Sequence, residues 1–234
     1  MKKVLFFCLL LLTGCTNTTP NLMIEWVDFI HINDEIYEVA YRLEIADPIL
    51  IGGKLGEITF NIADNIHDSE YRSKNGDATY LLPGTEVFSV NNEGNLVAIK
   101  DPDTLNGYKI YTKKNPAELN DFAMFAKNDI IKADIFFETS YKQFDLNRSI
   151  TDHEQIEQIM NNLQSGRPGA TNGYNDNNPQ FQSYAILLYT SSSVARKYSI
   201  FFDGERYSWS PWDSEVLPSE IANFLNSNEL VPAS

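Results

Sequence analysis

The chain has 234 residues, of which 43% are hydrophobic and 12% aromatic, and its formal net charge at pH 7 is -14. This is the composition of a folded protein, and the length is sufficient for one large hydrophobic core or two smaller ones. The acidic charge disfavours DNA, RNA and anionic lipid head groups as electrostatic partners, so no nucleic-acid partner is expected. It points to cationic or cation-bridged partners, or it serves only to keep the protein soluble.

The first fourteen residues have the pattern of an export signal. Lys2 and Lys3 give a charged start, the run from Val4 to Leu12 is apolar, and Gly14 ends it with a small residue. An uncleaved membrane helix is one alternative, but the run is well short of the roughly 20 residues needed to cross a bilayer. A soluble secretory signal is the other alternative, and the cysteine directly after Gly14 discriminates a lipobox from an ordinary cleavage site.

The tetrad Leu12-Thr13-Gly14-Cys15 resembles a bacterial lipobox. The resemblance implies that residues 1–14 are a lipoprotein signal peptide, and that Cys15 receives a diacylglyceryl group and becomes the first residue of the mature chain. The protein is then expected on the extracytoplasmic face of the cell membrane, anchored stably because the lipid has two chains. Cys8 and two lysines leave with the signal, so the formal charge moves from -14 to -16 and Cys15 is the one cysteine retained.

Residues 15–23 are expected to form a short tether, since Thr16 to Asn21 is polar and lacks apolar periodicity. Residues 24–114 have the pattern of β-strands separated by turns. Asn33-Asp34-Glu35 suits a hairpin, and glycines and prolines mark later turns at Asn75-Gly76-Asp77 and Pro83-Gly84. The sequence predicts strands at 26–32, 36–43, 56–62, 78–82, 85–90, 96–100 and 108–112.

Residues 115–234 mix helices with strands. One helix is predicted from Asn115 to about Lys127, and another follows Thr151, which we expect to be its N-cap with Glu154 completing a capping box. A final short helix is predicted from Pro218. The sequence further predicts strands at 130–138, 181–189, 195–202 and 205–209, a long loop at 165–180, and a buried helical face made of Ile156, Ile159, Met160 and Leu163.

The fold class expected is therefore α+β. A β-rich N-terminal half, arranged as a small antiparallel barrel or sandwich, precedes a mixed α/β C-terminal half. The change of pattern falls between Lys113 and Asp129. Two domains that share an interface, 24–114 and 115–234, are the preferred organisation, and a single α+β unit is the alternative.

No residue pattern identifies a catalytic, metal or cofactor site, so none is expected. Gly52 to Gly56 lacks the Gly-Lys-Ser/Thr ending of a phosphate-binding loop and predicts a glycine bend. Tyr207, Trp209 and Trp212 are the candidate ligand or partner surface, because exposed tyrosine and tryptophan are favoured at interfaces. Packing of these rings in the core is the stronger alternative, since Trp209 continues a predicted strand.

Four segments resemble uncharacterised lipoproteins of Bacillus and its relatives, over roughly the first half of the mature chain. They are Gly52–Ile58, Asn75–Ala78, Leu82–Thr85 and Ala123–Ile135. The resemblance implies an envelope location and a shared fold, and it implies no activity because those proteins have none assigned.

The function expected is that of a lipid-anchored exported protein. It would be a non-enzymatic binding or accessory module at the outer face of the cytoplasmic membrane, with an envelope protein or the cell wall as its partner. The first alternative is an envelope hydrolase that uses paired carboxylates. The second is a solute-binding component of a transporter, which the strand-rich first half makes less attractive because it lacks repeated βα units.

Overall fold

The computed structural model is β-rich, with antiparallel strands and a few helices. It describes residues 26–113, 115, 122–126, 129–141, 143–169, 178–209 and 215–226. The strands are β1 Phe29–Ile32, β2 Glu35–Ile45, β3 Ile51–Glu57, β4 Phe60–Asn61, β5 Asp77–Ala78, β6 Glu86–Val90, β7 Leu96–Lys100, β8 Tyr108–Thr112, β9 Lys132–Ser140, β10 Gln143–Ile150, β11 Arg167–Pro168, β12 Gln182–Tyr189, β13 Val194–Phe202, β14 Tyr207–Trp209 and β15 Glu215–Val216. The helices are η1 Pro48–Leu50, α1 Ile62–Asn65, α3 Phe122–Phe125, α4 His153–Gln164, η2 Ser219–Ile221 and α5 Ala222–Leu225.

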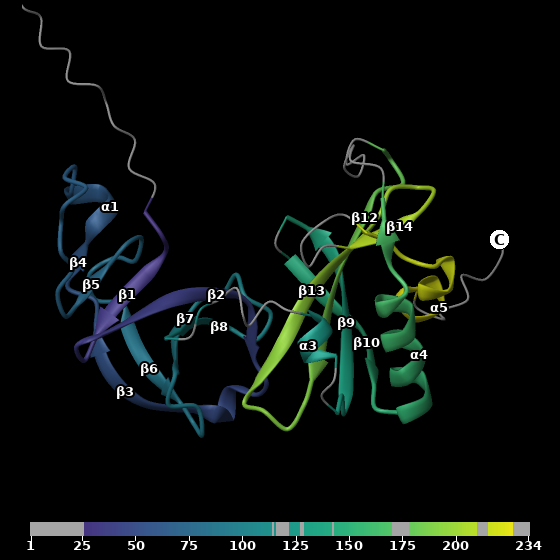
Figure 1. Ribbon diagram of the computed structural model, residues 1–234, viewed down its shortest axis with the longest axis horizontal. Coiled ribbons are helices and arrows are strands. Elements are labelled where there is room, and N and C mark those ends of the chain that lie inside the picture. The colour runs from purple at the N-terminus through teal and green to yellow at the C-terminus, as the bar shows by residue number, and fades with distance from the viewer. Residues whose placement is uncertain are drawn as a thin grey trace, which may run out of the picture.

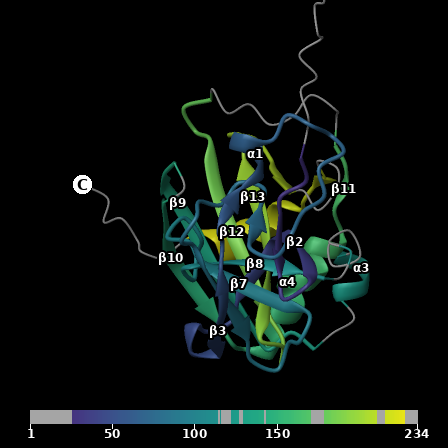
Figure 2. The same ribbon diagram turned by 90° about the vertical axis from the view of Figure 1, so that its left-hand side faces the viewer.

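The described strands form one hydrogen-bonded sheet system. Its main path runs β10-β9-β12-β13-β2-β8-β7-β6-β3, and all these neighbours are antiparallel. Figure 1 shows the strands from β1 to β8 on one side of the molecule and β9 to β14 on the other. Figure 2, viewed from the N-terminal side, shows β12 and β13 behind β2, β7 and β8. Pairing of β2 with β13 joins the two sets.

The hairpin predicted near Asn33 is confirmed. Asn33 and Asp34 have φ values of 53° and 60°, and the pair Ile32–Glu35 closes the loop between β1 and β2. Positive φ at both central residues is the geometry of a two-residue hairpin turn that matches the twist of its strands, and Asn and Asp tolerate it. β7 and β8 have the predicted bounds, and β6 begins one residue later than predicted.

The strand predicted at 56–62 is wrong as one element. β3 ends at Glu57, and β4 is only Phe60–Asn61 before α1 begins at Ile62. The side chain of Asn61 accepts a hydrogen bond from the Asp64 N–H at 2.9 Å, so it caps α1 and turns the chain. Two of the three alternating apolar residues, Ile58 and Ile62, are fully inaccessible, while Phe60 is only half-buried.

The predicted helix after residue 151 is confirmed, but its N-cap is not Thr151. Asp152 is the N-cap, and its carboxylate accepts from the Gln155 N–H at 3.0 Å. Asp is at least as good an N-cap as Thr, and the helix starts one residue later than predicted. The face made of Ile156, Ile159, Met160 and Leu163 is buried as predicted.

The strand β10 was not predicted from the sequence. It is a polar edge strand that pairs only with β9 among the described strands, and its register shifts twice, between Gln143 and Phe144 and between Leu146 and Arg148. Such shifts break the simple alternation on which strand prediction depends. The β12–β13 pair and β14 were predicted, and they follow within one or two residues.

The largest hydrophobic cluster lies between the β9–β12–β13–β14 face and the helices. Figure 1 shows α4 and α5 on the side of this sheet that faces away from β1 to β8. The cluster contains Trp209, Tyr198, Ile186, Ile159 and Leu225 among its buried members. A second cluster, around Ile30, Val87 and Tyr111, fills the N-terminal strands.

The final helix follows Pro218 as predicted, with Ile221, Phe224 and Leu225 buried. Of the helix predicted from Asn115, α3 at Phe122–Phe125 is seen, while residues 116–121 lie outside the described residues. Residues 170–177 of the predicted 165–180 loop also lie outside them, and β11 at Arg167–Pro168 occupies part of the rest. No helix in the described ranges is long and apolar enough to cross a membrane.

Candidate functional site

The loop between β7 and β8 is shaped by its own polar side chains. The carboxylate of Asp101 accepts from the Asp103 N–H at 3.0 Å, and the Thr104 hydroxyl donates to the Asp101 carbonyl at 2.8 Å. Gly107 has a φ of 77°, which lets the chain turn back into β8. The Asn106 side-chain amide then donates to the Ile45 carbonyl at 2.6 Å, which fixes the loop at the end of β2.

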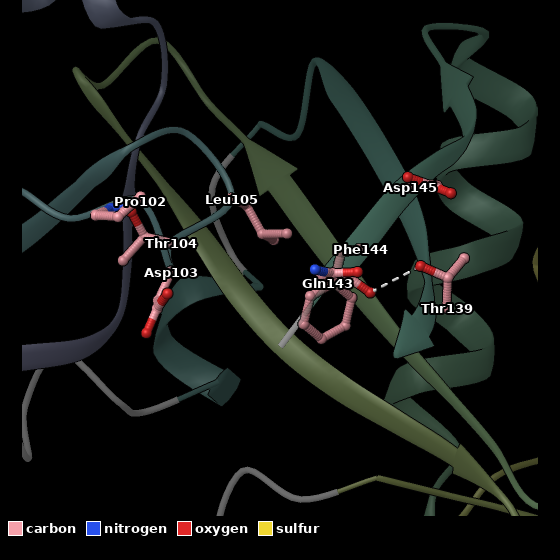
Figure 3. A pocket seen from close by; sticks show the side chains of 8 residues that line it. All are labelled: Pro102, Asp103, Thr104, Leu105, Thr139, Gln143, Phe144 and Asp145. Atoms are coloured by element: carbon pink, nitrogen blue, oxygen red, sulfur yellow. Dashed lines mark hydrogen bonds between the residues drawn. The ribbon is translucent and has the colours of Figure 1, made fainter. Parts of the chain in front are cut away.

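A cavity of about 490 Å³ separates this loop from the β9–β10 hairpin. Figure 3 shows the loop side chains on one side and those of the hairpin on the other. Leu105 points toward Phe144 in this view, and the hairpin end is held by a hydrogen bond of 3.3 Å from the Thr139 hydroxyl to the Gln143 carbonyl. The cavity is lined by Pro102, Asp103, Thr104, Leu105, Thr139, Gln143, Phe144 and Asp145.

A second cavity of about 360 Å³ adjoins the first, because Asp103, Thr104 and Phe144 line both. It extends to the place where β2, β8 and β13 meet. Its further lining consists of Ala40, Tyr41, Leu43, Glu44, Asp101, Lys109, Ile110 and Lys197. The two cavities together are called the junction groove below, and they are the candidate binding site.

An irregular stretch of β2 forms one wall of the junction groove. The pairing of β2 with β8 is interrupted between Val39 and Glu44, so the residues between them depart from strict alternation. Such irregularities redirect side chains and are common beside functional sites. Within this stretch, the Tyr41 side chain is exposed while Leu43 is buried.

Two lysines face the second cavity, and each has a buried carboxylate partner. Lys109 Nζ lies 2.8 Å from Asp28 Oδ2, and the Asp28 side chain is 5% exposed. The hydroxyl of Tyr111 donates to the other oxygen of Asp28 at 3.2 Å. Burial, followed by the negative charge of Asp28, raises the pKa of Tyr111 far above its ordinary value, so the phenol stays protonated.

The second lysine, Lys197, is ion-paired with Glu44 across the β2–β13 junction. Burial raises the pKa of Glu44, because a carboxylate loses solvation when it is removed from water. The Lys197 ammonium and the N–H groups of Leu105 and Asn106 lower it, but they offset burial only in part. The ammonium group is less buried than its partner, with 29% of the Lys197 side chain exposed.

The arrangement suits binding better than acid–base catalysis. Asp103 and Asp145 are both exposed, and Figure 3 shows their carboxylates on opposite sides of the cavity and not directed at one another. The lysine charges are balanced by buried carboxylates, so these groups are held in place as donors at the groove wall. Phe144 and Tyr41 add ring faces for apolar contact. Among the described residues, no three His, Cys, Asp or Glu side chains are grouped as a metal site requires.

The structure places two of the candidate surface residues in the core. Trp209 is 1% exposed and Tyr207 is 7% exposed, so neither presents its ring to a partner. The Trp209 ring meets that of Phe122 edge-to-face at 4.7 Å between centroids, and Trp209 Nε1 donates to Glu215 Oε2 at 3.2 Å. The expectation of a surface at Tyr207 and Trp209 is therefore corrected, because β14 pairs with β13 over the main cluster. Trp212 and Cys15 lie outside the described residues.

The residues of the junction groove were not identified from the sequence. Lys109 and Lys197 are 88 positions apart in the printed numbering, and only the pairing of β2 with both β8 and β13 brings them to one cavity. The turn residues Asp101-Pro102-Asp103 were the available signal for an ordered loop, but they say nothing of what the loop faces. No family model, no curated protein and no solved structure matches the chain.

Proposed function

We propose that the protein is a lipid-anchored exported module that binds an envelope component at the outer face of the cytoplasmic membrane, with the junction groove as its binding site. The lipobox pattern at Cys15 and the short polar tether support the location. The observation that supports binding is the junction groove, which combines ring faces, lysine donors and exposed carboxylates from both sets of strands. Such mixed lining is typical of a ligand site.

The groove supports a ligand that is neutral overall or cationic. Its lysines already have carboxylate partners, while Asp103 and Asp145 are exposed at its walls. The acidic charge of the whole chain would also repel a strongly anionic ligand. Cell-wall glycan strands or a cationic peptide segment therefore fit this groove better than a polyphosphate.

An envelope hydrolase is the second candidate, because Asp103 and Asp145 line one cavity. A solute-binding component of a transporter is less favoured, since the N-terminal strands are antiparallel except for the short β4–β5 pair and do not form repeated βα units. Asp103→Asn and Asp145→Asn variants separate hydrolysis from binding. A hydrolase would lose turnover of wall fragments, whereas a binding module would show no turnover even with both carboxylates present.

We also propose the finer organisation expected from the sequence, namely a barrel-like or sandwich-like unit at 24–114 and an α+β unit at 115–234. The separation of the two main hydrophobic clusters supports it, because one draws on residues before 113 and the other on residues after 121. The test is native-state hydrogen exchange. Two units would open with two different free energies, and a single cooperative opening of all slow amides would contradict the division.

Globomycin, which blocks the lipoprotein signal peptidase, tests the anchor. Cells treated with it should accumulate the unprocessed precursor, and a Cys15→Ser variant should remain unlipidated. Normal maturation in the presence of globomycin would remove the anchor from the proposal.

Proximity labelling from the anchored protein in its own envelope tests the groove. A partner labelled by the wild type should lose its label when Phe144 and Tyr41 are replaced by alanine. Ile49→Ala is the matched control, because Ile49 is 80% exposed and does not line the groove. Equal labelling by the groove variant and the control would contradict binding at this site.

A further inference from the structure

Three large side chains are exposed around the start of the described chain. Val27 is 59% exposed, Tyr41 is 68% exposed and Tyr80 is 51% exposed. These residues, together with the half-buried Trp26, are called the entry patch below. The entry patch contains aliphatic surface and amphipathic rings, which is the composition favoured where one end of a side chain is apolar and the other is wet.

Contacts hold the members of the entry patch in one place. The Tyr80 hydroxyl donates to the Trp26 carbonyl at 2.9 Å, and the Thr79 hydroxyl donates to the Val27 carbonyl at 2.7 Å. Lys109 connects Tyr41 to this place, because its ammonium lies over the Tyr41 ring and is paired with Asp28, the residue after Val27. Burial, followed by the negative charge of Asp28, raises the pKa of Tyr41. The patch is therefore assembled from β2, the segment after β5 and the chain just before β1.

The entry patch has no strong charge of its own to repel a neutral surface. The carboxylate of Asp28, the residue after Val27, is buried and paired with Lys109, and Lys109 Nζ lies 5.7 Å from the centre of the Tyr41 ring. Lysine beside tyrosine is a common combination at the boundary between lipid and water. The rest of the chain is acidic, which directs contact with a bilayer to this patch rather than to other faces.

Covalent geometry keeps the entry patch near the anchor. Trp26 is the eleventh residue after Cys15 in the sequence. A fully extended segment of that length spans at most about 40 Å, and an unrestrained chain of that length has a mean reach of about half that. The entry patch lies next to Trp26, so the length of the segment from Cys15 to Trp26 limits how far the patch can lie from Cys15.

We infer that the entry patch contacts the lipid–water interface of the bilayer to which Cys15 is anchored. This inference rests on the proposed lipid anchor. Val27 and the rings of Tyr41 and Tyr80 enter the head-group region, and the phenolic hydroxyls stay at its polar level. Because Tyr41 also lines the junction groove, the groove then opens beside the bilayer surface.

The test supplies the anchor chemically. The mature chain from Cys15 to Ser234 has a single thiol, which is coupled to a maleimide lipid in phosphatidylcholine vesicles. Tyrosine nitration, followed by mass spectrometry, is compared between the coupled and the free protein. Tyr41 and Tyr80 should react severalfold more slowly when coupled, while Tyr141, which is 85% exposed on the β9–β10 turn, should react at an unchanged rate.

A double variant Val27→Ser/Tyr41→Ser sharpens the result, because both side chains are exposed and the fold does not depend on their burial. In this variant Tyr80 should regain most of its reactivity on vesicles. Nitration of Tyr41 and Tyr80 at the free rate in the coupled wild type would overturn the inference, and so would equal protection of Tyr141. Since the thiol is coupled by hand, the outcome is independent of whether cells acylate Cys15, which globomycin tests separately.

Discussion

Lys197 on β13 and Glu44 on β2 form an ion pair across the junction between the two sets of strands. The Glu44 side chain is 1% exposed, and the backbone pairing beside it consists of three residue pairs, Val194–Ile45, Ala195–Glu44 and Arg196–Leu43. The pair therefore lies at a short connection that also forms a wall of the junction groove.

Replacing Lys197 by methionine should destabilise the protein. Glu44 would remain buried without its cation, and we expect the free energy of unfolding at pH 7 to fall by about 3 kcal/mol. Urea denaturation followed by far-UV circular dichroism measures this value. Adding Glu44→Gln to Lys197→Met should restore part of the loss, because the buried charge is then gone. Losses that simply add would contradict an interaction between the two side chains.

The contribution of Glu44 to stability should decrease as the pH rises. Its pKa in the folded protein is raised, so between the unfolded and folded values the folded state binds more protons than the unfolded state. The free energy of unfolding of the wild type should therefore decline, relative to Glu44→Gln, as the pH rises through this window from about 4.3 upward. Denaturation of both proteins across the acidic and neutral range measures the difference, and a constant difference would contradict the raised pKa.

Trp209 should be a major contributor to the C-terminal core. Trp209→Ala removes a ring that is 1% exposed and contacts Phe122, and we expect it to lower the free energy of unfolding by about 3–5 kcal/mol. Leu146→Ala is the control, because Leu146 is 56% exposed and its loss should change stability by less than about 0.5 kcal/mol. If Trp209→Ala and the wild type unfolded at the same midpoint urea concentration, the result would contradict burial of Trp209 and favour a surface position for its ring.

The N-cap of α4 can be assigned to Asp152 or Thr151 by comparing two variants. Asp152→Ala removes the acceptor of the Gln155 N–H, and we expect a loss of about 1 kcal/mol. Thr151→Ala, one residue earlier and on an exposed side chain, should have little effect. Thermal denaturation of the two variants compares them, and a larger loss at Thr151 would favour the cap predicted from the sequence.

Gly76 should not tolerate a side chain. Its φ is +89°, and a Cβ atom there would clash with Thr59 Oγ1. Gly76→Ala should cost more than about 1 kcal/mol, since alanine is strained at positive φ. Gly53→Ala meets no atom within 4 Å and should be close to neutral. Equal stability of both variants in urea would show that the turn at Gly76 can relax.

Local patterns predicted the elements that depend on neighbouring residues. The Asn33-Asp34 turn, β7, β8 and the buried face of α4 all follow from turn chemistry or from simple periodicity. The failures occurred where one polar side chain changed the outcome. Asn61 capped a helix inside a predicted strand, and Asp152 competed successfully with Thr151 for the cap.

The candidate site could not be predicted because its residues come from separate strands. Tyr41, Lys109 and Lys197 converge only through the order β8–β2–β13, which no local pattern specifies. Tyr207 and Trp209 were easier to single out in the sequence, but aromatic side chains occur both in hydrophobic cores and on binding surfaces. Burial of Trp209 shows that pairing partners decide between the two outcomes.

The three residue pairs between β2 and β13 also bear mechanical force applied between the two sets of strands. A force applied between the strands before β9 and those from β9 onward passes through the covalent connection and this short ladder. The ladder is reinforced by the Lys197–Glu44 ion pair, by a hydrogen bond from the Ala46 N–H to the Ser193 carbonyl and by an apolar cluster that includes Ala195 and Leu105. The groove has walls on both sides of the ladder, because Tyr41 and Lys109 belong to β2 and β8 whereas Lys197 belongs to β13, so a change in how the two sets of strands are placed would change the width of the groove.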